Sequence, residues 1–234
     1  MAGLDGRTRA LAALAEEVSA CRRCPRLVEW RERVAAEPPR RYAGQRYWAR
    51  PLPGFGDPRA RILVVGLAPA AHGGNRTGRI FTGDRSGDWL FASMHRVGLA
   101  SQPTSVHRDD GLRLDGAYVA AAVRCAPPGN RPTPAERDRC LPYLARELEI
   151  LEDVRVVAAL GSFAWDAALR ALAMQGHPLP RPRPRFGNGV EAAVGPYTLL
   201  GSYHPSQRNT FTGLLTEDML DAVFRRAIAI AGRS

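Results

Sequence analysis

Four cysteines are the residues of this chain with the clearest capacity for chemistry: Cys21, Cys24, Cys125 and Cys140. The first two form a C-x2-C pair, and the other two follow after a gap of 100 residues, with 14 residues between them. No secretory signal is expected, so a disulfide framework is not expected either. Four thiolates suit a zinc ion or an iron–sulfur cluster. The spacing favours such a site over a chance C-x2-C pair accompanied by two buried core cysteines.

A long glycine-rich segment, GLAPAAHGGNRTGRIFTGD at residues 66–84, follows a strand-like run, RILVVG. Five of its residues are glycines. Because glycine lets the main chain approach a ligand closely, the segment predicts a binding loop at the end of a buried strand. It lacks the G-K-[ST] ending of a P-loop, which argues against binding of a nucleoside triphosphate.

All 33 basic residues of the 234-residue chain are arginines, and the net charge is +10. Arginine pairs with phosphate in two-point geometry, so a basic surface of this kind suits nucleic acid. A GC-rich genome explains most of the missing lysine. The chemical consequence stands all the same, since no lysine is available to form a Schiff base.

No apolar run approaches the length of about 18–20 residues that a membrane span needs. The N-terminal stretch loosely resembles a signal peptide, but its short apolar part runs into Glu16 and Glu17. That pattern favours an amphipathic helix. We therefore expect a cytoplasmic protein with no membrane partner.

The sequence predicts alternating strands and helices, and these elements position the residues described above. Nearly continuous apolar runs predict strands at residues 61–66, 118–124, 154–160 and 197–203. Helical patterns alternate with them at residues 4–20, 86–97, 133–151, 162–174 and 216–231. This alternation predicts an α/β fold, a three-layer α/β/α sandwich with a mostly parallel central sheet of about four strands. We expect residues 1–234 to form a single domain.

A polar segment follows each expected strand. These segments are the glycine-rich loop, CAPPGNRPTP, GSFAW and HPSQRNTFTG. They should meet at one edge of the sheet, where ligands of such folds bind. His204 leaves a strand there, which favours a functional role over that of a solvated loop histidine. Simpler roles stay open for three others, namely Asp84 as a helix cap, Asn130 as a turn residue and Phe81 as a core aromatic.

The combined motifs resemble one family. They are C-R-R-C-P, Y-W-A-R-P-L-P-G-F-G-D, the whole glycine-rich loop, R-C-A-P-P-G-N-R-P, the isolated Cys140, L-G-S-F-A-W, and H-P-S with N-T-x-T-G. Together they resemble the uracil-DNA glycosylase superfamily, specifically its iron–sulfur-containing type b branch (family 5), over nearly the whole chain. The resemblance implies a structural [4Fe–4S] cluster on Cys21, Cys24, Cys125 and Cys140.

The resemblance also implies a DNA repair enzyme. Such an enzyme flips a deaminated base out of double-stranded DNA and hydrolyses its N-glycosidic bond. Phe81 matches the aromatic residue that stacks on the base, and His204 matches the histidine that stabilises the departing base anion. Asp84 is our candidate for activating water. We assign catalytic roles to Asp84, His204 and Asn130, and a base pocket to Gly66, Ala68, His72, Asn75 and Phe81.

Two departures from the family pattern concern specificity. Residues 66–70 read G-L-A-P-A, where the sister iron–sulfur branch has G-E-A-P-G, and Ala121 stands where that branch has an asparagine before its third cysteine. A pocket with fewer polar groups that read the base should discriminate less. We therefore expect uracil together with hypoxanthine or xanthine, and etheno adducts as further substrates. Without lysine, the enzyme should have no lyase activity and should leave an intact abasic site.

The segment at residues 206–212 should prop the duplex open as a wedge. The arginine-rich stretches at residues 40–50 and 181–185 are candidates for contact with flanking phosphates. We expect a monomer. The candidate DNA-binding residues are Ser162, Ser206, Gln207, Arg208 and Asn209.

Two other classes of protein stay open as alternatives. A non-catalytic nucleic-acid-binding module with a structural metal site would show the same basic charge and four cysteines. A small iron–sulfur electron carrier would usually group its cysteines more tightly. The ordered polar segments after all four strands favour the enzyme over both alternatives.

Overall fold

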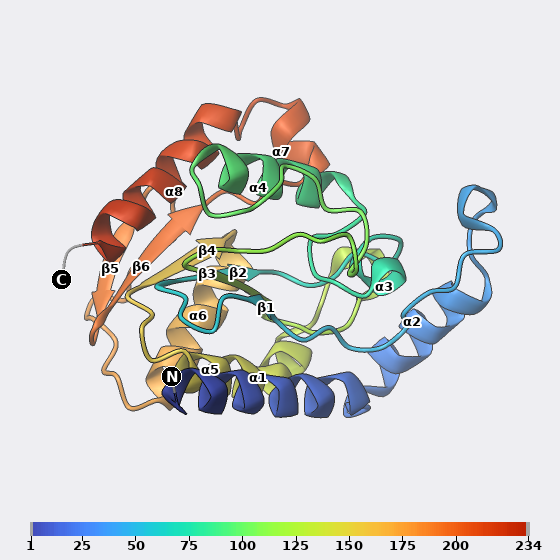
Figure 1. Ribbon diagram of the computed structural model, residues 1–234, viewed down its shortest axis with the longest axis horizontal. Coiled ribbons are helices and arrows are strands. Elements are labelled where there is room, and N and C mark those ends of the chain that lie inside the picture. Colours follow the sequence, from blue (N-terminus) through green and yellow to red (C-terminus); the bar gives the residue numbers. More distant parts are fainter. Residues whose placement is uncertain (1, 233–234) are drawn as a thin grey trace.

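A sheet of six strands, in the order β1-β3-β2-β4-β6-β5, separates two layers of helices (Figure 1). The structure is a computed structural model, and it describes residues 2–232. The strands are β1 (Phe55–Gly56), β2 (Ile62–Gly66), β3 (Ala117–Ala121), β4 (Val156–Leu160), β5 (Glu191–Val194) and β6 (Tyr197–Ser202). The four central strands are parallel, while β1 and β5 pair antiparallel at the two edges. The predicted parallel strands are therefore confirmed, and two short edge strands extend the sheet.

The helices lie on both faces of this sheet (Figure 1). One face carries α4 (Arg85–Arg96) and α8 (Glu217–Ala231), and the other carries α1 (Ala2–Ala20), α5 (Pro134–Ile150) and α6 (Ser162–Met174). Three further helices are α2 (Pro25–Ala36), α3 (Gly74–Thr77) and α7 (Gln207–Phe211). The three-layer prediction is confirmed. Among residues 2–232, no helix has the length and apolar character that crossing a membrane requires.

The apolar runs arise because the central strands are covered on both sides. In β2, Ile62 and Val64 belong to the core under α4 and α8, while Leu63 and Val65 belong to the core under α5 and α6. All five residues of β2 are buried, as are those of β3 and β4. A strand buried on both faces has no polar side, so its sequence does not alternate.

Local sequence signals begin the helices that carry candidate site residues. Thr133 and Glu136 form a reciprocal capping box at the start of α5, the helix that contains Cys140. Asp84 caps α4, and Ser206 caps α7. Each of these caps fixes the point where a loop at the sheet edge becomes a helix.

Candidate active site

A cavity of about 720 Å³ opens at the carboxyl ends of the parallel strands. Its wall comes from residues 67–73 after β2, from Asn130 after β3, and from His204 and residues 206–208 after β6. The segment after β4 lies directly behind it, because a Cβ atom on Gly161 would stand 3.4 Å from the Cβ of His204. Three of the four expected polar segments therefore line one cavity, and the fourth contacts it through His204.

An aromatic ring forms part of the cavity wall. Phe81 is 7% exposed and has a left-handed main chain, with φ of 51°. A Cβ atom on Gly66 would stand 2.6 Å from two carbons of its ring. The ring centroid of Phe81 lies 5.8 Å from that of His204, with 33° between the ring planes. Gly66 itself does not line the cavity but makes the space that the Phe81 ring occupies.

His204 enters the cavity directly after β6. Its main-chain carbonyl accepts hydrogen bonds from the Ser206 amide at 2.8 Å and from Nδ2 of Asn209 at 2.9 Å. Burial lowers the pKa of the imidazole to about 4. The ring is therefore neutral at physiological pH and has one N–H to donate.

Asp84 is the N-cap residue of α4 and lines the same cavity. Its Oδ1 accepts the Gly87 amide at 3.0 Å, as an N-cap does. Burial raises the pKa of this carboxyl group, although the hydrogen bond from Gly87 opposes the shift. A Cβ atom on Gly73 would collide with the Asp84 carboxylate. The glycine-rich sequence thus allows the loop to close over this acid.

Three other expected residues also line the cavity: Ala68, His72 and Asn130. Nδ1 of His72 lies 2.9 Å from the hydroxyl of Tyr47. Burial lowers the pKa of His72, and the charges of Arg41 and Arg76 add to this effect. Asn130 has a left-handed main chain, with φ of 56° in the turn after Cys125. It stands at the mouth of the cavity and is exposed to solvent.

Asn75 and Ser162 lie elsewhere. Asn75 is 1% exposed, does not line the cavity, and donates from Nδ2 to the main-chain carbonyl of Arg31 at 3.2 Å. Its polar side chain stabilises the interior between α2 and α3. Ser162 is an exposed first residue of α6, outside the cavity lining. Asn209 supports the His204 main chain instead of facing the cavity.

The short helix α7 carries the predicted wedge segment. Ser206, Gln207 and Arg208 line the cavity mouth, and the last two are exposed. Sequence reasoning missed Phe211, which is 67% exposed at the end of α7. The guanidinium carbon of Arg85 lies 4.3 Å from the centroid of its ring. An aromatic residue in a polar segment after a strand is the signal that could have identified it.

Three of the four cysteines lie together beside the cavity. Cys24, Cys125 and Cys140 are buried in one cluster with Leu27 and Val123, and Ala68 of the cavity wall packs against it. Cys21 is partly exposed. Burial raises the pKa values of the Cys125 and Cys140 thiols. Within residues 2–232, no group of three or more His, Cys, Asp or Glu side chains could hold a metal ion as the side chains stand.

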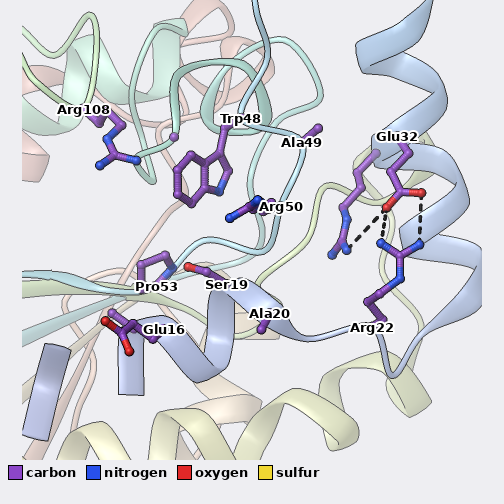
Figure 2. Close-up of a pocket in the computed structure, with 13 residues that line it drawn as sticks. Glu16, Ser19, Ala20, Arg22, Glu32, Trp48, Ala49, Arg50, Pro53 and Arg108 are labelled. Atoms are coloured by element: carbon purple, nitrogen blue, oxygen red, sulfur yellow. Dashed lines mark hydrogen bonds and ion pairs between the residues drawn. The ribbon is translucent and has the colours of Figure 1, made fainter. Parts of the chain in front are cut away.

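A second cavity of about 820 Å³ lies beyond α3, between α1, α2 and residues 48–53 (Figure 2). Trp48 stands in it with the guanidinium carbons of Arg50 and Arg108 at 5.7 and 4.7 Å from its ring centroid. The hydrogen-bonded pair of Arg22 and Glu32 lines another side of this cavity. The helix α3 separates this cavity from the first, because its N-cap Gly73 lines one and its C-cap Gly78 lines the other.

Comparisons with known proteins identify the relatives of this chain. The family model of the uracil DNA glycosylase superfamily matches residues 53–227. The chain is 54% identical to the type-5 uracil-DNA glycosylase of Mycobacterium tuberculosis over 231 residues, which cover 98% of this chain and 85% of that protein. It is 50% identical to the type-5 uracil-DNA glycosylase of Thermus thermophilus over 223 residues, 94% of this chain and 98% of that protein.

A more distant relative is the type-4 uracil-DNA glycosylase of Pyrobaculum aerophilum. It is 28% identical over 162 residues, which cover 69% of this chain and 74% of that protein. The type-5 relatives thus match at higher identity and over more of the chain. With the family model matched from the first strand to the last helix, and with type-5 relatives across nearly its full length, the chain belongs to the uracil DNA glycosylase superfamily.

Proposed function

We propose that this chain removes uracil from double-stranded DNA by hydrolysing the N-glycosidic bond, and that it leaves an intact abasic site. The chain is an enzyme of the N-glycosyl hydrolase class, like the superfamily to which it belongs. The observation that supports the proposal most is one cavity that gathers an aromatic ring, a neutral histidine and a partly buried carboxyl group: Phe81, His204 and Asp84.

The cavity suits a flipped base. A target base must leave the duplex before its glycosidic bond can be reached. The cavity volume of about 720 Å³ leaves room for a nucleotide, and the part of its wall at residues 67–71 carries only apolar side chains. In this proposal the base stacks on the Phe81 ring, whose position depends on the missing side chain of Gly66.

His204 is proposed to stabilise the departing base. As the bond breaks, negative charge grows on a carbonyl oxygen of uracil, and a fixed hydrogen-bond donor there lowers the barrier. The burial that lowers the pKa of His204 to about 4 keeps the imidazole neutral. A neutral imidazole donates this hydrogen bond while the leaving group keeps its charge.

Asp84 is proposed to orient the attacking water. The sugar passes through an oxocarbenium-like state, which a nearby carboxylate also stabilises. The ionised form is the one that accepts a proton from water, so the raised pKa of Asp84 should limit activity at acidic pH. Asn130, at the cavity mouth, is proposed to contact the polar edge of the base.

The basic surface is proposed to bind the DNA backbone. The net charge is +10, and Arg41, Arg85 and Arg208 surround the mouth of the cavity. Each phosphate that is neutralised should steepen the salt dependence by about one unit of log K per unit of log salt. A DNA substrate also fits the expected cytoplasmic location. That location and the monomeric state stay predictions.

We also propose that the base range extends to hypoxanthine or xanthine. Residues 67–71, directly after β2, are one leucine, one proline and three alanines. None of them has a carboxylate or amide side chain. Discrimination comes mainly from polar groups that a wrong base would leave unpaired. Because residues 67–71 offer no such group, this part of the wall should accept several deaminated bases.

Finally, we propose that Cys21, Cys24, Cys125 and Cys140 hold a [4Fe–4S] cluster. A buried cation supports this fit, because Arg31 is 2% exposed and its Nη1 lies 2.9 Å from the sulfur of Cys125. Such a cluster would draw its four sulfur ligands from the connection between α1 and α2, from the segment after β3 and from α5. When bound, it would cross-link α1 and α2 to the segment after β3 and to α5.

The decisive experiment is base release from end-labelled duplexes that contain one uracil, hypoxanthine or xanthine, followed by alkali. Wild type should produce alkali-labile sites, and Asp84→Ala and His204→Ala should each lower the rate about 100-fold. Two matched controls are Asp88→Ala, one turn further along α4, and His107→Ala, an exposed histidine in a loop. Both controls should keep the wild-type rate.

Two outcomes would contradict the proposal. Release of uracil alone would refute the broad base range and leave uracil excision standing. Tight binding of the duplex without release of any base would favour the non-catalytic nucleic-acid-binding module.

A further inference from the structure

The buried amide of Asn75 connects the wall of the base cavity to the cysteine site. Asn75 lies in α3 and donates from Nδ2 to the main-chain carbonyl of Arg31 in α2 at 3.2 Å. Its Oδ1 is buried and has no hydrogen-bond partner among the described residues. A buried amide that makes one hydrogen bond of its possible set is poorly explained by stability alone.

Arg31, on the other side of this hydrogen bond, is a buried cation with an unusual set of partners. Its Nη1 donates to the sulfur of Cys125 at 2.9 Å, and its Nη2 donates to the main-chain carbonyl of Cys21 at 3.3 Å. The carboxylate of Glu32 lies 3.9 Å from Arg31 and accepts hydrogen bonds from Arg22 (Figure 2). Nε of Arg31 has no partner in the described chain.

Such a cation is costly to bury unless negative charge lies beside it. Glu32 supplies part of that charge from 3.9 Å, but its carboxylate is 43% exposed and is shared with Arg22. Neutral thiols add none, whereas the thiolates of an iron–sulfur cluster would place negative charge against the guanidinium. Hydrogen bonds to ligand sulfurs are also a known means by which a protein tunes and holds its cluster. The position of Arg31, and of the α2 main chain that carries it, should therefore depend on the cluster.

On its other side, α3 fixes the loop that forms the cavity. The main-chain N–H of Asn75 donates to the main-chain carbonyl of Ala70 at 3.1 Å. The neighbouring Arg76 donates from Nε to the carbonyl of His72 at 2.7 Å and from Nη2 to that of Gly83 at 3.1 Å. These bonds join both ends of the loop, and Gly73 at the start of α3 packs against the Asp84 carboxylate. A shift of α3 would therefore move the candidate acid.

We propose that Arg31 and Asn75 form a strut that transmits the presence of the cluster to the wall of the base cavity, with both side chains acting as positioning residues for base excision. The proposal rests on the function and the cluster proposed above. Loss of the cluster would release Arg31, weaken the bond to Asn75 and loosen residues 66–84.

The test compares Asn75→Leu, Arg31→Gln and a control on the same helix, Arg33→Gln, whose side chain is 53% exposed. Three properties are measured on each purified holoprotein. They are the iron content with the decay of visible absorbance under ferricyanide, amide hydrogen exchange of residues 66–84, and single-turnover release of uracil.

Asn75→Leu should keep wild-type iron and wild-type decay. It removes one buried hydrogen bond together with an unpaired buried acceptor, so its net effect on the stability of the fold should be small. We expect faster exchange in residues 66–84 and a release rate lowered about tenfold, with little change in the concentration of duplex that half-saturates the enzyme. Arg31→Gln should show the same loop exchange and, in addition, cluster decay about tenfold faster than wild type.

Wild-type exchange and release in Asn75→Leu would overturn the proposal, as would wild-type cluster decay in Arg31→Gln. A wild-type protein that contains no iron would also overturn it, while uracil release by that protein would leave the proposed function standing. If iron-loaded wild type releases no base, the proposed function fails. In that case, the amide hydrogen exchange of residues 66–84 in Asn75→Leu still tests the strut by itself. Faster exchange supports the strut, and wild-type exchange refutes it.

Discussion

The ring of Phe81 rests on Gly66, so closely that a methyl group at position 66 would stand 2.6 Å from two of its carbons. We expect Gly66→Ala to push the ring toward His204 and to lower kcat/KM for uracil release about tenfold to 100-fold, because a small misplacement of a binding surface is enough to slow the chemistry. Gly6→Ala is the matched control, since the space around Gly6 is open. Equal rates for both variants would contradict the stacking role of Phe81.

The substitution Asp84→Asn removes the negative charge of the side chain but keeps its ability to cap α4. Asparagine also caps helices, so the hydrogen bond from Gly87 should survive the substitution. We expect uracil release to slow about 100-fold. For wild type, kcat/KM should fall as pH drops through a pKa above the usual aspartate value, since burial raises it. The variant should lose this acid limb.

The same raised pKa gives a prediction for stability. The folded state holds the Asp84 proton more tightly than the unfolded chain does, so stability falls as pH rises through the interval between the ordinary and the raised pKa. Asp84→Asn should therefore be at least as stable as wild type at neutral pH, measured by urea unfolding. A variant that is both slower and clearly less stable would indicate a structural role for the carboxylate.

His204 gives the opposite dependence on pH. Its pKa is about 4 in the folded protein against an ordinary value of 6.5, so the unfolded chain binds the additional proton between these values. Stability should be complete above pH 6.5 and should be lost as pH falls toward 4. In His204→Gln, the free energy of unfolding measured with urea should lose this pH dependence, and kcat should fall about 100-fold or more. The same substitution at the exposed His107 should change neither property.

The main features of the fold were predictable because they depend on patterns that the sequence carries directly. Three of the four parallel strands are buried along their whole length and β6 is buried over its last four residues, so each leaves a largely apolar run. The edge strand β5 was missed because most of its residues are at least partly exposed, which gives no such run. The helix α2 was missed because arginine and glutamate obscure its few buried positions, such as Leu27 and Val34.

The candidate site was predictable only in part, for a related reason. A polar residue in a glycine-rich loop has the same sequence signature whether it faces a ligand or the interior. Asp84 and His72 line the cavity, yet Asn75 turns inward to Arg31. The partner of that hydrogen bond lies 44 residues away in the chain. No local pattern encodes such a distant contact.

Phe211 gives a test of the wedge. It is 67% exposed on α7 and lies under the guanidinium of Arg85. Phe211→Ala should weaken binding of uracil duplexes and slow base release about tenfold, because an apolar side chain that fills a vacated stack favours the flipped state. Release from single-stranded DNA should change little. Met174→Ala, another exposed apolar residue, is the control and should leave duplex activity unchanged.

The absence of lysine predicts that this enzyme does not cut the DNA strand. An enzyme that also cuts the strand needs an amine to attack the sugar, and this chain has no lysine side chain. Uracil duplexes should therefore be cleaved only after alkali, and borohydride should trap no covalent complex between protein and DNA. Acetylation of the N-terminal amine should change neither result. A trapped complex would show that an imine forms, and the reaction would then not be the simple hydrolysis that Asp84 and His204 are proposed to support.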